Sequence, residues 1–217
     1  MKHAIHIPRL VLPRRLSTPR LDMAARTRHS AVTILLHWSS VLAILLATGA
    51  ILTREAVEDD AWRNALLDVH RQAGLFVLVA LGLRLAVRFA AGMADFTHEL
   101  PPLLRLAAAA AHAALYAMLL ALPLLGWATT SAHGVTLRLF GLVALPAIAR
   151  KDSDLADTLG DWHLWAAWGL LALVAMHVAA ACWHHFGRRD RVLSAMLPLA
   201  RPRSDRLPRL SALRMRR

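Results

Sequence analysis

The chain has 217 residues, of which 57% are hydrophobic, and its mean hydropathy of +0.45 excludes an ordinary soluble domain and indicates an integral membrane protein. The formal net charge is +12, but seven Lys and Arg residues lie in residues 1–30 and ten in residues 187–217, so the charge indicates orientation across a membrane rather than nucleic-acid binding. A single cysteine, Cys182, excludes a disulfide framework, a thiolate metal cluster and the CxxCH attachment of a c-type haem.

Both ends of the chain are basic and are interrupted by proline. Residues 1–29 contain Pro8, Pro13 and Pro19 and no apolar run that fits a secretory signal, so we expect them to form a disordered N-terminal tail. Residues 188–217 form a second basic tail, which we expect in the cytoplasm. The sequence therefore places the membrane domain at residues 30–187.

Between the tails lie four apolar stretches, each long enough to cross the ~30 Å hydrocarbon core of a bilayer as a helix. They cover residues 31–52, 66–91, 103–130 and 159–186. The sequence predicts an all-α integral membrane protein that crosses the bilayer four times as a four-helix bundle.

Two connections between the spans, residues 53–66 and 131–158, are rich in acidic residues, in contrast to the basic tails. Within the second connection, residues 135–148 are apolar but too short to cross a bilayer, so we expect an interfacial or re-entrant segment lying over the bundle. Four spans place both termini on one side of the membrane. The positive-inside rule makes that side the cytoplasm.

The fourth span carries two histidines, His163 and His177, fourteen residues apart. Fourteen residues are two heptads, so in a packed helix both imidazoles face the bundle, about 21 Å apart along the axis. An ionisable side chain inside a membrane indicates a functional site and needs a partner on another helix. The remaining spans must therefore supply histidines at two matching depths.

Two further histidines match these depths. His37 lies ~9 Å inside its span and His177 ~13 Å inside the same side of its own span, whereas His70 and His163 each lie ~6 Å inside the opposite side. We therefore pair His37 with His177 and His70 with His163. His112 in the third span is a rival partner at nearly the depth of His177, and His184 is a weaker rival close to a helix end.

Two imidazoles that face each other without further ligands do not suit zinc, which takes about four ligands. They suit the axial positions of a haem, and two pairs predict two haem b groups with six-coordinate iron that transfer electrons. The alternative is that each histidine is only a hydrogen-bonded interior group in a structural bundle without haem, which four histidines at paired depths make less attractive.

Three arginines lie near the predicted haem levels. Arg84 is about seven residues inside its span, where an unpaired charge is costly, so we expect it to meet an anion such as a haem propionate or a quinone headgroup. Arg71, next to His70, could do the same at the other haem. Arg88 lies close to the helix end and is expected to extend to the lipid headgroups.

Over residues 29–197 the chain resembles the bacterial cytochrome b561 family of four-helix dihaem membrane proteins. The resemblance rests on several short motifs considered together. They are His37-Trp38, His70, the pair Arg84 and Arg88, His112 and Tyr116 followed by Ala121-Leu122-Pro123 and Gly126, Phe140-Gly141-Leu142, Trp162-His163, His177 and His184-His185.

The resemblance implies haem ligands on the first, second and fourth spans, which are His37, His70, His163 and His177 here, and makes His112 a weaker candidate. It also implies a bacterial inner membrane and electron transfer between a quinone, such as ubiquinone, and a second redox partner, with superoxide as one proposed donor. We favour a self-contained quinone-linked oxidoreductase. The alternative is a haem b membrane anchor that relays electrons for a catalytic subunit of the hydrogenase or formate dehydrogenase kind.

Overall fold

A computed structural model describes residues 30–91, 101–189 and 192–197. The expected N-terminal tail and most of the expected C-terminal tail lie outside these residues. The described part is dominated by four long helices, each apolar and long enough to cross a membrane. They are α2 (Ala31–Ala56), α3 (Asp60–Ala91), α4 (Pro102–Ala132) and α5 (Ser153–Phe186). The predicted all-α membrane bundle is confirmed.

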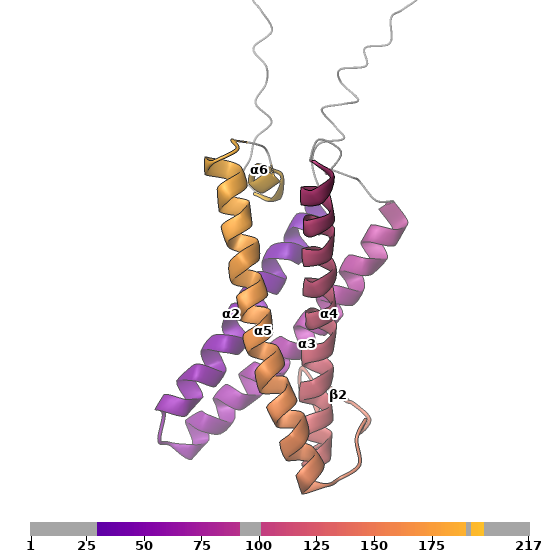
Figure 1. Ribbon diagram of the computed structural model, residues 1–217. Coiled ribbons are helices and arrows are strands. Elements are labelled where there is room, and N and C mark those ends of the chain that lie inside the picture. Colours follow the sequence, from indigo (N-terminus) through magenta and orange to yellow (C-terminus); the bar gives the residue numbers. More distant parts are fainter. Residues whose placement is uncertain (1–29, 92–100, 190–191, 198–217) are drawn as a thin grey trace, which may run out of the picture.

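The helices pack as two antiparallel pairs. Figure 1 shows α2 and α3 as one pair that leans across a second pair formed by α4 and α5. All four helices contribute to one buried cluster midway along the bundle, between the two histidine levels of α5. Its members are Ala43, Val77, Leu81, Leu119, Leu122 and Leu170. Most other apolar side chains face outward, as expected for helices in contact with lipid.

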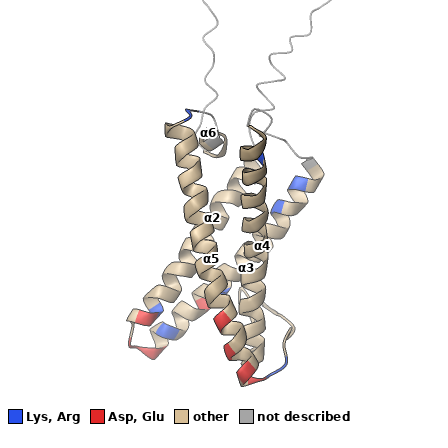
Figure 2. Ribbon diagram, in the orientation of Figure 1, with Lys and Arg blue, Asp and Glu red and all other residues tan. Residues whose placement is uncertain are grey.

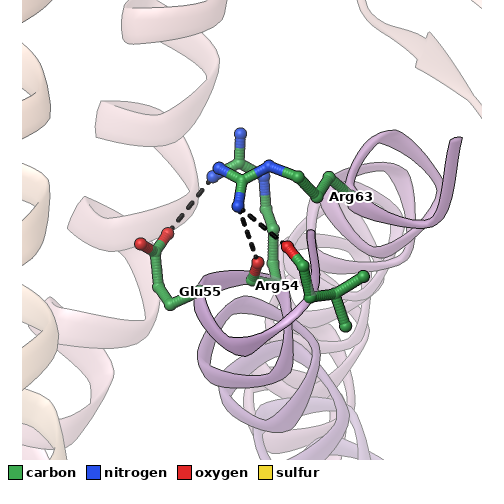
Figure 3. A network of polar contacts seen from close by, with 4 residues as sticks. Arg54, Glu55 and Arg63 are labelled. Carbon is green, nitrogen blue, oxygen red and sulfur yellow. Dashed lines mark hydrogen bonds and ion pairs between the residues drawn. The ribbon is translucent and has the colours of Figure 1, made fainter. Parts of the chain in front are cut away.

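The connection between α2 and α3 is much shorter than the predicted residues 53–66. Only residues 57–59 separate the helices, because the polar residues at each end continue the helix beyond the hydrocarbon. Asp59 starts α3 by accepting a 2.9 Å bond from the backbone N–H of Trp62. Arg63 donates from Nη1 to the carbonyls of Arg54 and Val57 at 3.2 and 3.1 Å, and so closes the C-terminal end of α2 (Figure 3).

The segment predicted to lie over the bundle forms a small antiparallel hairpin of β1 (Arg138–Leu139) and β2 (Val143–Ala144), with Arg138 opposite Ala144. Gln72 of α3 holds it, because its side-chain nitrogen donates to the Arg138 carbonyl at 2.8 Å and its side-chain oxygen accepts from the Phe140 N–H at 2.7 Å. Phe140 itself has a φ of 49°, which is unusual for a bulky residue. The hairpin is thus attached two residues from His70.

Two capping contacts define α5. Asp152 accepts a 3.1 Å bond from the N–H of Leu155 at the start of the helix, and that bond holds the pKa of the Asp152 carboxyl below its ordinary value. At the other end the N–H of Gly187 bonds to the Trp183 carbonyl at 2.8 Å.

A short helix, α6 (Val192–Met196), follows α5. It was not predicted, and the indole N–H of Trp38 donates to its Met196 carbonyl at 2.8 Å.

Charge separates the two ends of the bundle (Figure 2). Every carboxylate among the described residues lies toward the end that carries the hairpin, which we call the acidic end. They are Glu55, Glu58, Asp59, Asp60, Asp68, Asp152, Asp154, Asp157 and Asp161. The opposite end, which we call the basic end, carries Arg84, Arg88, Arg105, Arg188 and Arg189. The first residues of α2 and the last of α5 both lie at the basic end.

Candidate haem sites

The structure brings His70 of α3 and His163 of α5 together at the acidic-end level. Their ring centroids are 5.9 Å apart and the ring planes are inclined by 74°. Both side chains are half-buried inside the bundle. Each residue is the eleventh of its helix, so two helices that begin at the same end carry their imidazoles to the same depth.

Backbone carbonyls orient both of these rings. Nδ1 of His70 lies 2.9 Å from the Ala47 carbonyl of α2, and Nδ1 of His163 lies 3.1 Å from the Leu122 carbonyl of α4. A carbonyl only accepts, so each Nδ1 carries the proton and each Nε2 keeps its lone pair. This is the arrangement of a metal-binding histidine whose second nitrogen is fixed by the surrounding protein.

Gly126 of α4 makes room for the His163 ring. A Cβ at this position would lie 3.2 Å from Cε1 and 3.4 Å from Nδ1 of His163, which is closer than side chains usually approach. The absence of a side chain therefore lets the imidazole lie against the backbone of α4 and reach the Leu122 carbonyl. Sequence reasoning noted Gly126 only as part of a motif, and the carbonyl partners Ala47 and Leu122 carry no sequence signal.

The basic-end level contains three histidines. His177 lies beside His112, with ring centroids 5.5 Å apart and planes inclined by 82°. His37 stacks edge-on against Trp38 at 5.6 Å. His37 and His177 are half-buried, whereas His112 is exposed on the outside of the bundle and directs Nδ1 to the Ala108 carbonyl of its own helix at 2.7 Å. His112, the rival considered from sequence, is thus the histidine whose ring lies beside that of His177, although it is the more exposed of the two.

Arg84 contacts neutral groups beside His37. Its Nη2 donates to the Leu36 carbonyl at 2.6 Å and to Oγ of Ser40 at 3.1 Å. Its Nε is buried and has no hydrogen-bond partner within the described residues, so one donor of this guanidinium is unused. Of the other two arginines, Arg88 is exposed near the basic end, and Nη1 of Arg71 pairs with Oδ1 of Asp68 at 3.3 Å.

The donor set fits a porphyrin iron better than a bare metal ion. Within residues 30–91, 101–189 and 192–197 there is no group of three or more His, Cys, Asp or Glu side chains that could hold a metal. A haem needs only two axial nitrogens, because the macrocycle supplies the other four. The His70 and His163 pair, with both Nε2 atoms available and both rings oriented, meets that need.

The chain is similar to known membrane cytochromes. Residues 28–199 match a family described as prokaryotic cytochrome b561. The chain is 29% identical over 172 residues to cytochrome b561 homolog 2 of Escherichia coli (strain K12), an alignment that covers 78% of this chain and 91% of that protein. It is 30% identical over 173 residues to cytochrome b561 homolog 1 of the same organism, with 79% and 97% covered. It is also 26% identical over 174 residues to the probable superoxide oxidase CybB of Yersinia pestis, with 80% and 98% covered.

Proposed function

The chain belongs to the prokaryotic cytochrome b561 family of membrane electron-transfer proteins, and from that premise we propose that it conducts electrons across the bacterial inner membrane through two b-type haems. The observation that carries the proposal is the His70 and His163 pair, in which both Nδ1 atoms bond to backbone carbonyls and both Nε2 atoms remain available. His37 and His177 complete the proposed set of axial ligands.

Bound at these positions, haem would supply reversible one-electron oxidation and reduction. The protein contributes the remaining properties. The Ala47 and Leu122 carbonyls fix the rings at the acidic-end level, and the apolar cluster that includes Val77 and Leu170 fills the space between the two levels. A bundle filled in this way keeps water out of the path between the two haems.

We infer that the basic end faces the cytoplasm. The described residues at that end carry arginines, the carboxylates of the described residues lie at the opposite end, and four spans return the chain to the side where it started. The His70 and His163 level then lies toward the periplasm. The His37 and His177 level lies toward the cytoplasm.

We propose that the reaction links ubiquinone to a second redox partner, with superoxide as the candidate electron donor. The support is the similarity to a relative named as a probable superoxide oxidase. The net charge of the acidic end does not attract an anion, since its described carboxylates outnumber its described cations and Arg71 and Arg150 already pair with Asp68 and Asp152. An anionic donor would therefore depend on local cations near the His70 level.

A turnover experiment tests this function. The chain is purified alone, mixed with a superoxide source, and followed by its haem absorbance with and without a ubiquinone analogue. We expect reduction that superoxide dismutase abolishes, followed by reoxidation by the quinone over many turnovers, and we expect a His70→Ala control to lose the activity. Slow reduction that superoxide dismutase does not affect would contradict the proposal.

The alternative function is that of an electron-carrying anchor for a catalytic subunit. One observation favours it: the hairpin at the acidic end exposes Leu142 at 82% and Val143 at 58%, which is an apolar surface available to a partner. Co-purification of a large catalytic subunit from the native membrane, together with no quinone turnover by the chain alone, would establish the anchor.

A further inference from the structure

Arg54, near the C-terminal end of α2, has an unused donor in a buried position. Its side chain is 25% exposed, its Nη1 pairs with Oε1 of Glu55 at 3.2 Å, and its Nε is buried without a hydrogen-bond partner within the described residues. A buried donor that makes no bond is costly to the folded protein. The Arg54 guanidinium therefore has hydrogen-bonding capacity that the described part of the protein does not use.

A second guanidinium lies at the same place. Arg63 donates to the Arg54 and Val57 carbonyls, so its side chain folds over the end of α2 next to Arg54 (Figure 3). Within the part of the chain that the structure describes, Glu55 pairs with Arg54 and is 68% exposed, and no carboxylate pairs with Arg63. Within the described residues no ion pair therefore neutralises the Arg63 guanidinium, although Glu58, Asp59 and Asp60 lie in the adjoining sequence.

Both arginines lie seven residues along the chain from a residue of the His70 site. Arg54 follows Ala47, whose carbonyl holds the His70 ring, by seven residues, and Arg63 precedes His70 by seven. Seven residues are two helical turns, so each arginine lies about 10 Å from the His70 level along its helix and on the same helical face. Both displacements run toward the acidic end.

A haem carries two propionate carboxylates on one edge of its ring, and arginine binds carboxylates through paired N–H donors. We propose that Arg54 and Arg63 bind the propionates of the haem held by His70 and His163. This inference rests on the proposed function, because it requires a haem at that level. It assigns these residues a role that sequence reasoning had considered only for Arg84 and Arg71.

The test compares purified holoprotein carrying Arg54→Gln or Arg63→Gln with the unmodified chain. The matched control is Arg150→Gln, since Arg150 also lies at the acidic end and pairs with Asp152 but its side chain is 80% exposed. Two quantities are measured: the rate at which haem passes to apomyoglobin and the propionate bending bands in the resonance Raman spectrum. We expect Arg54→Gln to accelerate the loss of one haem about tenfold and to shift one propionate band, and Arg150→Gln to change neither.

Two further variants make the result specific. Arg54→Lys keeps the charge without the planar fork and should give a smaller acceleration with the band still shifted. In a His70→Ala background the Arg54→Gln change should have no effect on the remaining haem. Unchanged propionate bands in both glutamine variants would overturn the proposal, as would a loss of bound anionic phospholipid as their only effect. A wild-type chain that binds no haem would instead overturn the proposed function.

Discussion

Replacing His70 or His163 with alanine is expected to lower the haem content of the purified chain from two per chain to one. Each substitution would remove one of the two nitrogens proposed to bind the same iron, and the remaining imidazole would hold a non-covalent haem weakly on its own. For the same reason the double variant should also retain one haem rather than none. The pyridine haemochrome assay, normalised to protein, measures this directly.

The matched control is His133→Ala, because His133 is exposed at the end of α4 and takes part in neither histidine level. It should retain two haems. If His70→Ala and His163→Ala removed different haems, so that the double variant lost both, the two residues would not share an iron. In that case the hydrogen bonds from His70 and His163 to the Ala47 and Leu122 carbonyls would not serve to orient two ligands of one haem.

The second large effect concerns the basic-end level. His177→Ala and His37→Ala should each remove the other haem, whereas His112→Ala should leave both in place. His112 is the exposed member of the three, whereas His37 and His177 are half-buried. Haem content and the number of low-spin signals in the electron paramagnetic resonance spectrum distinguish the variants.

His112 deserves this test because its ring centroid lies 5.5 Å from that of His177. A variant series in which His112→Ala loses a haem and His37→Ala keeps both would reassign the ligand to α4. The haem would then lie between α4 and α5 rather than between α2 and α5. The assignment of His37 would be wrong in that case, while that of His177 would stand.

The number and approximate position of the spans could be predicted because hydrocarbon imposes a length of about 20 apolar residues on each helix. The residues at which the helices end could not be predicted in this way. The helices continue past the apolar stretches into polar sequence, as at Glu55, Asp60 and Asp154, where capping by Asp59 and Asp152 decides the boundary. The Asp59 cap starts α3 early, so the connection between α2 and α3 is three residues long instead of the fourteen expected.

The meeting of His70 and His163 could be predicted, because helical rise converts sequence separation into depth. The pairing of His37 with His177 stays a prediction. Depth alone does not determine which face of a neighbouring helix a side chain occupies. That is why His112 could be placed near His177 in height but not on the outside of the bundle. The carbonyls that orient His70 and His163 belong to Ala47 and Leu122, and no side-chain pattern identifies a backbone acceptor.

The small elements at the two ends were also beyond sequence reasoning. Residues 135–148 were expected to lie over the bundle, but their hairpin depends on long-range bonds from Gln72. Helix α6 is five residues long and is held by the indole of Trp38, which lies more than 150 positions away in the chain. Neither contact follows from local propensity, since each is decided by which helix ends meet in the folded bundle.

The proposed function requires that the chain bind two non-covalent haems through four histidines. The most direct measurement is the ratio of haem to protein in the purified chain, determined by the pyridine haemochrome assay before and after extraction with acidified acetone. We predict two haems per chain before extraction and none afterwards. One haem per chain, or haem that remains attached to the protein after extraction, would contradict it.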